Sequence, residues 1–126
     1  MNYDEFNQFC NALPATTHVV QWGNADVWKI GGKVFAIGGW GKESQPAFTF
    51  KTSSLNYEFL SDLEGYIPAP YFANRGMKWI QQTGTDGHLD EDLKYYVCES
   101  YRIVSDSLTK RKQEEITAIV RKQQGS

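Results

Sequence analysis

Two adjacent glycines, Gly31 and Gly32, constrain the fold of this chain more than any other feature. They separate "VWKI" from "KVFAI", two runs rich in β-branched and aromatic residues. A two-residue turn between strands needs positive φ angles, which glycine adopts without steric cost, so the pattern predicts an antiparallel hairpin. The register expected from this turn pairs Ile30 with Lys33, Lys29 with Val34, Trp28 with Phe35 and Val27 with Ala36.

The glycine-rich continuation "GGWGKE" does not fit a nucleotide-binding loop. A phosphate-binding loop needs a glycine five residues before the Gly-Lys pair and a hydroxyl residue after it, but this chain has Ala36 and Glu43 at those positions. A dinucleotide fingerprint needs a glycine where Ser44 stands and a helix that Pro46 blocks. We therefore expect these glycines to loosen the end of the second strand of the hairpin.

Hydrophobic periodicity predicts three helices, at residues 2–13, 54–64 and 90–108. Strands are expected around "HVVQW", "DVWKI", "KVFAI", "AFTFK" and "MKWIQQT", with the first the weakest. The order, summarised as α-β3-α-β2-α with a fourth strand before the second helix left open, predicts a two-layer α+β sandwich: an antiparallel sheet with helices on one face. The helical residues expected to face the core are Phe6, Phe9, Cys10 and Leu13, then Leu55, Phe59, Leu60 and Leu63, then Leu93, Tyr96, Val97, Tyr101, Val104 and Leu108.

Local signals place the ends of these elements. Ser53 or Ser54 is expected to cap the second helix and Asp90 the third. The segment "YIPAPYFANRG" contains two prolines, so it is expected to run extended over the surface.

The 126 residues suffice for one domain with a substantial core and are too few for two. We predict a single domain over residues 1–109, followed by a polar, partly flexible tail at 110–126. The tail should be dispensable for folding, because Ile116, Ile119 and Val120 are too few to anchor a helix strongly. Since no apolar run is long enough for a membrane span and no signal or lipidation motif occurs, a cytoplasmic protein without a membrane partner is expected.

No catalytic constellation can be assembled from this sequence. His18 and His88 lie near predicted loops, where an isolated histidine is usually solvated, and no serine or cysteine has the surroundings of a nucleophile. Cys10 and Cys98 lie in helical patterns outside any CxxC motif, which favours buried free thiols. The acids at 90–92 open a helix, where the helix dipole favours negative charge without a metal. We therefore expect no enzyme activity, no catalytic residue, no metal and no cofactor.

Four segments together resemble the MmcQ/YjbR family over nearly the whole chain: "QWGNADVWKIGGKVFAI", "FTFKTS", "IPAPYFANRGMKWIQ" and "DEDLKYYVCESYRIVSDSLTKR". The matching residues are Gly32, Lys33, Phe35 and Ala36, then Phe50 and Lys51, then Pro70, Tyr71 and Trp79, and finally Ser100 and Tyr101. Many members carry histidines where this chain has Phe72 and Lys78, so any role of those histidines does not carry over. The resemblance implies a small cytoplasmic α+β fold, related to frataxin-like and secretion-chaperone-like domains, and a DNA-binding function without established enzyme activity.

Charge indicates which surface a partner would contact. The net charge is only −2, yet the expected sheet segments at 27–51 and 71–82 hold six cations and one acid, whereas the helical segments are acidic. Strand alternation places Trp28, Ile30, Phe35, Ile37, Phe48, Phe50, Met77 and Trp79 towards the helices. The same alternation places Val27, Lys29, Val34, Ala36, Thr49, Lys51, Lys78 and Ile80 on the helix-free face.

We therefore predict a non-enzymatic DNA-binding protein that contacts phosphates through a basic sheet face. The predicted contact residues are Lys29, Lys51, Tyr71, Arg75, Lys78, Lys110, Arg111 and Lys112. Tyr71 and Phe72, beside prolines, are candidates for base stacking, whereas Trp79 is expected in the core. Two alternatives remain open: the lysines serve only solubility and protection of strand edges, or the same face binds a protein partner or a second copy through Val27, Val34 and Ala36.

Overall fold

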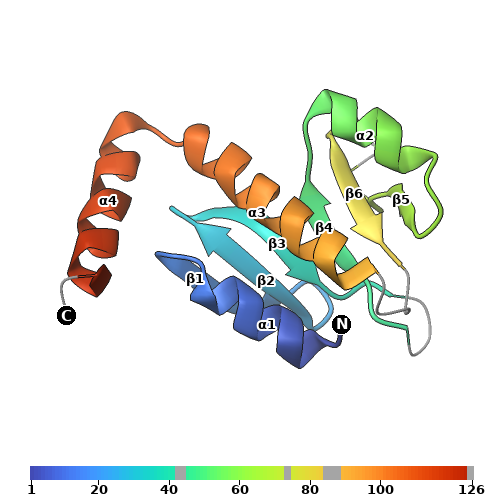
Figure 1. The fold of residues 1–126 in the computed structure, drawn as a ribbon, viewed down its shortest axis with the longest axis horizontal. Helices are drawn as coiled ribbons and strands as arrows, with labels where there is room; N and C mark the ends of the chain where they lie inside the picture. The colour runs from blue at the N-terminus through green and yellow to red at the C-terminus, as the bar shows by residue number, and fades with distance from the viewer. Residues whose placement is uncertain (42–44, 73–74, 84–88, 125–126) are drawn as a thin grey trace.

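A six-stranded antiparallel sheet in the order β1-β2-β3-β4-β6-β5 forms one layer of the described part of the chain (Figure 1). The computed structural model describes residues 1–41, 45–72, 75–83 and 89–124. The expected turn at 84–88 with its His88, and residues 42–44, lie outside these ranges. The strands are β1 (Thr16–Gln21), β2 (Ala25–Ile30), β3 (Lys33–Gly38), β4 (Phe48–Lys51), β5 (Tyr66–Pro68) and β6 (Trp79–Gln82).

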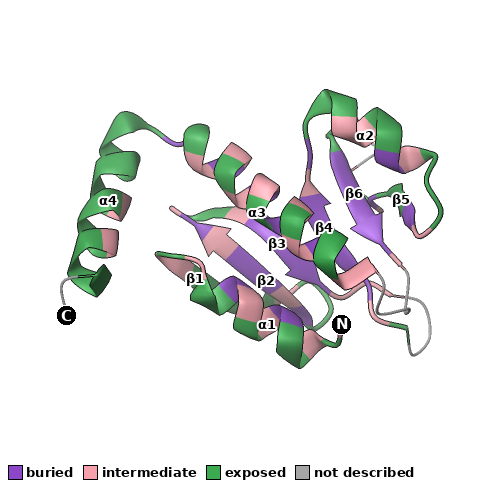
Figure 2. Ribbon diagram, viewed as in Figure 1, coloured by how far each residue is buried: buried purple, intermediate pink, exposed green. Residues whose placement is uncertain are grey.

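Helices α1 (Tyr3–Ala12), α2 (Ser54–Ser61) and α3 (Asp90–Asp106) lie on one face of this sheet. Side chains from all three helices share one buried cluster with sheet residues; its members include Phe6, Cys10, Leu60, Leu93, Val97, Phe35, Phe50 and Ile80. Figure 2 shows this burial concentrated on the strands and on the inner sides of the helices. The predicted α+β class is confirmed, with one more strand before α2 and one more helix after α3 than the order α-β3-α-β2-α.

The glycine hairpin forms as predicted, but only its first two pairs keep the expected register. Gly31 and Gly32 both have positive φ, 59° and 84°, and Ile30 pairs with Lys33 and Lys29 with Val34. A β-bulge then shifts the register, so that Trp28 lies opposite Ala36 and Val27 opposite Ile37. The predicted pairs Trp28–Phe35 and Val27–Ala36 are therefore wrong.

The bulge also changes which side chains of β3 face the helices. Phe35 and Ala36 both join the helix-side core. Ile37 turns to the helix-free face, where it packs with Val27 and Ala25. The predicted facing of Ala36 and Ile37 is therefore reversed, because one extra residue in a strand inverts the alternation beyond it.

Ser100 of α3 binds the sheet at the position of this bulge. The β3–β4 ladder stops at Ala36 and Phe50, one pair short of Phe35 and Lys51. The fully buried Ser100 hydroxyl donates to the Phe35 carbonyl at 2.6 Å and accepts from the Lys51 amide at 2.9 Å. One side chain thus satisfies two backbone groups that the β3–β4 ladder leaves unpaired.

Strand β6 faces opposite to the predicted direction. Ile80 lies beside Phe50 of β4 and joins the helix-side core, whereas Trp79 lies beside Lys51. Trp79 is buried as predicted, but on the helix-free face, where it stacks on Phe72 with ring centroids 4.6 Å apart. The apolar residues of "MKWIQQT" occur at both strand parities, so the pairing with β4, and not the pattern, sets the orientation.

Fewer apolar side chains of the α2 segment are buried than its hydrophobic pattern predicts. Its N-cap Ser53 accepts a hydrogen bond from the Asn56 amide, as expected. Leu60 is fully buried, but Leu55 and Phe59 are 76% and 59% exposed and Leu63, just beyond the helix, is 39% exposed. The expectation that these three face the core is wrong, because the short helix packs only over β5 and β6 at one end of the sheet (Figure 1).

The start of α3 differs from the predicted cap. Leu89 is the N-cap and makes no side-chain capping bond. Asp90 is instead the first helical residue, and its carboxylate accepts a hydrogen bond from the terminal ammonium of Met1 at 2.7 Å. The Asp90 carboxylate thus links the start of α3 to the segment before α1.

The C-terminal segment forms a helix, α4 (Lys110–Gln124), at the end of the sheet near the β2–β3 turn (Figure 1). No described residue of α4 is buried. Its contact with the domain includes the half-buried Ile116, and Leu108 before the helix lies so near that a Cβ on Gly31 would come within 2.6 Å of it. That this segment is dispensable for folding stays a prediction. Among the described helices, none is both long and apolar enough to cross a membrane.

The two edges of the sheet differ in character. Strand β1 has six residues, four of which, Thr17 to Val20, are exposed. Strand β5 has only three residues and ends in Pro68. The longer edge also carries no Lys, Glu, Asp or Pro within Thr16–Gln21.

Candidate functional site

Five aromatic side chains gather on the helix-free face of the sheet. Trp22 lies in the β1–β2 turn, Trp40 follows β3, and Tyr71 and Phe72 lie between β5 and β6. Ring centroids are 6.1 Å apart for Trp22 and Trp40, 5.5 Å for Trp40 and Tyr71, and 5.9 Å for Trp40 and Phe72, and Phe72 stacks on Trp79. Three loops far apart in the sequence thus contribute to one aromatic surface.

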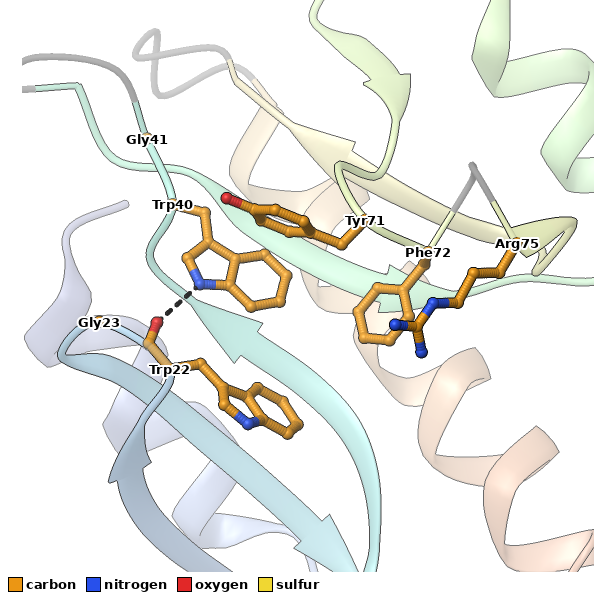
Figure 3. Close-up of a pocket in the computed structure, with 7 residues that line it drawn as sticks. All are labelled: Trp22, Gly23, Trp40, Gly41, Tyr71, Phe72 and Arg75. Atoms are coloured by element: carbon orange, nitrogen blue, oxygen red, sulfur yellow. Dashed lines mark hydrogen bonds between the residues drawn. The ribbon is translucent and has the colours of Figure 1, made fainter.

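Four of these rings line an open pocket of about 740 Å³. Figure 3 shows Trp22, Trp40, Tyr71 and Phe72 around it, with Arg75 on the side of Phe72. The Trp40 indole N–H donates to the Trp22 carbonyl at 3.0 Å, which ties two of the loops together. Trp22 is 49% and Tyr71 67% exposed, so their rings are available to a ligand.

Three of the four aromatic residues at this pocket have unusual backbone conformations. Trp22, Trp40 and Tyr71 have φ angles of 54°, 65° and 72°, a region that bulky L residues seldom adopt. Each such residue costs about 1 kcal/mol or more, and conformations of this kind concentrate at functional sites. The loops therefore hold these rings at the surface at the expense of backbone strain.

A second pocket, of about 340 Å³, continues from the first because both are lined by Trp22 and Phe72. Its further lining residues are Lys33, Val34, Lys51, Met77, Trp79, Val104 and Ser107. We call the two pockets together the aromatic groove. The indole nitrogen of Trp79 is buried in its wall and has no hydrogen-bond partner among the described residues, although a buried indole N–H usually has one.

The aromatic groove has a one-sided charge. Its described lining residues include the cations Arg75, Lys33 and Lys51 and no acid, and none of the three cations forms an ion pair with another described residue. Lys29 lies on the same face, beside Val34 in the sheet. The described lining of the groove thus combines exposed rings with three cations.

The structure brings together half of the predicted contact residues. Tyr71 and Arg75 line the first pocket, Lys51 lines the second, and Lys29 lies on the same face. Lys78 does not join them: its ammonium lies 4.7 Å from the ring centroid of Tyr57 in α2, on the helix side. The prediction that Lys78 faces away from the helices is wrong, because β6 is oriented by its pairing with β4.

The remaining predicted cations, Lys110, Arg111 and Lys112, form the first turn of α4. This turn begins three residues after Ser107, which lines the second pocket. Arg111 and Lys112 face Glu115 at 3.8 and 3.6 Å, in exposed pairs of little energetic value. That any of the predicted residues binds nucleic acid stays a prediction.

No described group has the arrangement of a catalytic or metal centre. Cys10 is buried, and burial raises the pKa of its thiol, which disfavours the reactive thiolate. Cys98 is exposed, contrary to the expectation of two buried thiols, and partial burial followed by the charge of Glu99 raises the pKa of its thiol. His18 contacts Asp26 at 2.9 Å at the surface, and no group of three or more His, Cys, Asp or Glu side chains within the described ranges could hold a metal.

A family model described as YjbR matches residues 11–103, which include every described strand and all lining residues of the aromatic groove except Val104 and Ser107. The chain belongs to the YjbR family. The resemblance read from the sequence segments is thereby confirmed, and α4 lies outside the matched region.

Solved structures agree with this YjbR assignment at the level of the fold. The crystal structure of the Deinococcus radiodurans protein DR2400, described as a DUF419 domain, has a TM-score of 0.77 at 20% identity and covers 90% of this chain and 86% of that one. A Pseudomonas syringae protein has a TM-score of 0.66 at 16% identity, covering 82% of this chain and 99% of that one. No curated protein matches the chain.

Sequence reasoning missed Trp22 and Trp40 as site residues. Hydrophobicity assigns a tryptophan to the core by default. The signal that could have found them is their neighbours: Trp22 precedes Gly23, and Trp40 stands between Gly39 and Gly41. A large aromatic residue in a glycine turn cannot reach the core of a sheet, so it belongs to the surface.

Proposed function

We propose that this YjbR protein binds nucleic acid, DNA in the first instance, through the helix-free face of its sheet. The observation that carries the proposal is the aromatic groove, whose described lining joins exposed rings to three cations without an acid. Rings and cations on one surface are the two components from which proteins build contacts to bases and phosphates.

The charge distribution supports this orientation of the molecule. Acids stand in the first turns of α1 and α3, namely Asp4 and Glu5, then Asp90, Glu91 and Asp92, on the helix side. The opposite face carries Lys29, Lys51 and Arg75. Although the net charge is −2, this separation of acids from cations directs a polyanion to the sheet face and repels it from the helix side.

The salt dependence of binding tests the proposal. Each cation that neutralises a phosphate adds about 0.9 to the negative slope of log K against log salt on duplex DNA, and about 0.7 on a single strand. With about three to five contacts, the slope should be roughly −2 to −5 by the same rule. Fluorescence anisotropy of labelled oligonucleotides between low and moderate salt measures it.

Two variants distinguish phosphate contacts made by the sheet face from the effect of removing any positive charge. Changing Lys29, Lys51 and Arg75 together to Gln should flatten the slope by about 2 to 3. Lys78→Gln is the matched control, because it removes a lysine of the opposite face and should leave the slope unchanged. Absence of binding to both duplex and single strands at low salt would refute the proposal and leave solubility as the role of these lysines.

A second candidate function, a protein-interaction module, is favoured by the exposed stripe of Leu55, Phe59 and Leu63 on the α2 side. The alternative that uses the sheet face is poorly supported, because Val27 and Ala36 are completely buried. If wild-type protein forms dimers with rising concentration in light scattering, and Phe59→Ser abolishes them, this module is the better account.

A further inference from the structure

We infer that the aromatic groove takes unpaired bases, so that the ligand of this face is a short single-stranded segment of nucleic acid and not an intact duplex. This inference rests on the proposed function and specifies its substrate class. It is supported by the shape of the groove, by the strained backbone of the residues whose rings surround it, and by the Trp79 indole N–H, which has no described hydrogen-bond partner.

The shape of the groove suits an unpaired base. The first pocket, about 740 Å³, is within the range that encloses small molecules. Its most exposed rings, Trp22 and Tyr71, lie on either side of Trp40 (Figure 3). A base inside a duplex is covered by its neighbours above and below and cannot present its face to these rings, whereas a base of a single strand can.

Backbone strain at the same residues argues that the rings serve a ligand. Trp22, Trp40 and Tyr71 have positive φ angles at the mouth of the pocket, where glycine or asparagine would fold with less strain. Three such residues from three different loops lie around one hollow. Burial of apolar surface alone does not explain this, since Tyr71 remains 67% exposed.

Trp79 supplies an independent indication of a polar ligand. This residue is 4% exposed and lines the second pocket of the groove together with Lys33 and Lys51. Its indole N–H lacks an acceptor within the described residues, and a buried donor without an acceptor costs about 1–3 kcal/mol. The nitrogen is covered in the structure, so a base, sugar or phosphate oxygen of a strand in the groove would supply that acceptor once the side chains over it shift.

The arrangement assigns parts of the strand to parts of the groove. One base stacks in the first pocket, against Trp22 and Tyr71. The neighbouring sugar and phosphate then lie along the second pocket, near Lys51 and the Trp79 indole. Arg75 contacts a phosphate at the rim of the first pocket. Recognition by stacking is tolerant of sequence, so we expect little discrimination among bases.

The test compares three labelled probes at low salt: an eight-nucleotide single strand of mixed sequence, a blunt hairpin duplex with a fully paired stem, and a mononucleotide. The single strand should bind at least about tenfold more tightly than the duplex, and the mononucleotide more weakly than either because it offers one phosphate.

Variants of the wild-type chain locate the contact. Tyr71→Asn should weaken single-strand binding by roughly 5- to 100-fold, and asparagine tolerates the left-handed backbone, so the fold is kept. Tyr95→Asn is the matched control, because Tyr95 is another strongly exposed tyrosine, 58%, and lies on α3. Trp79→Phe keeps an aromatic ring without the N–H and should weaken binding several-fold while the salt slope stays the same.

The outcomes separate this inference from the proposed function. Duplex binding as tight as single-strand binding, with no effect of Tyr71→Asn, would overturn the inference and leave nucleic-acid binding intact. A mononucleotide that binds as tightly as the strand would also overturn it, by showing a small-molecule pocket. Failure of all three probes to bind would overturn the proposed function itself.

Discussion

The hydroxyl of Ser100 is the most informative single group to remove, because it replaces a missing backbone pair between β3 and β4. In Ser100→Ala the Phe35 carbonyl loses a buried hydrogen bond of 2.6 Å, and the Lys51 amide loses a part-buried one of 2.9 Å. A buried backbone group without a partner costs about 1–3 kcal/mol, so two such groups would cost about 2–6 kcal/mol together.

Two effects reduce this cost. Alanine is the better helix former by about 0.5 kcal/mol, and the two backbone groups can move towards each other once the hydroxyl no longer separates them. We therefore expect Ser100→Ala to lower the free energy of unfolding by about 2–3 kcal/mol. Urea unfolding followed by tryptophan fluorescence and circular dichroism measures this loss, provided the two probes report the same transition.

Ser105→Ala on the same helix is the matched control. The Ser105 hydroxyl oxygen is buried but has no hydrogen-bond partner among the described residues. Its removal gains the same helix propensity and orphans no backbone group, so it should leave stability unchanged or raise it by about 0.5 kcal/mol. Equal effects of the two substitutions would refute the argument that Ser100 holds the bulge.

Three further outcomes are expected. Tyr71→Asn should stay within about 1 kcal/mol of the wild-type stability, because relief of backbone strain offsets the lost ring contact; a larger loss in urea unfolding would show that the ring is a structural element. Native protein should react with a thiol reagent at Cys98 alone, and Cys10 should react only on unfolding. The reaction rate at Cys98 should rise at a higher pH than for a free cysteine, because its raised pKa keeps the thiol protonated. Fast reaction of two thiols in the native protein would contradict this. Truncation after Thr109 should cost only about 1 kcal/mol, because Ile116 is the one residue of α4 packed against the core among those described; a loss of several kcal/mol in thermal unfolding would show that α4 belongs to the domain.

The predictable part of the fold depends on short-range signals. Gly31 and Gly32 determine a turn within the hairpin itself, and the first two pairs follow from it. The bulge at Phe35 could not be read in this way, because it is stabilised by Ser100, which lies 65 residues further along the chain. Periodicity assumes an uninterrupted strand, so the predicted faces of Ala36 and Ile37, which follow the bulge in β3, were inverted.

The candidate site was predicted only in part, for the same reason. Tyr71 and Arg75 were found because prolines and charge mark their segment as exposed. Trp22 and Trp40 are brought to them by loops that meet only in the folded chain. Lys78 was placed on the wrong face because the orientation of β6 is set by β4, and no local pattern encodes that pairing.

The unlike edges of the sheet limit how molecules of this protein can join. Strand β1 leaves one side of its backbone unpaired along a run without lysine or proline, so it can accept a strand from another chain. Strand β5 is too short, and its Pro68 removes a donor, so it cannot serve as the second attachment point. Growth of a fibre needs two competent edges on each molecule, whereas this sheet has one. Any strand addition therefore ends at a pair of molecules joined β1 to β1, which protects a concentrated solution of this protein from amyloid-like extension of its native sheet.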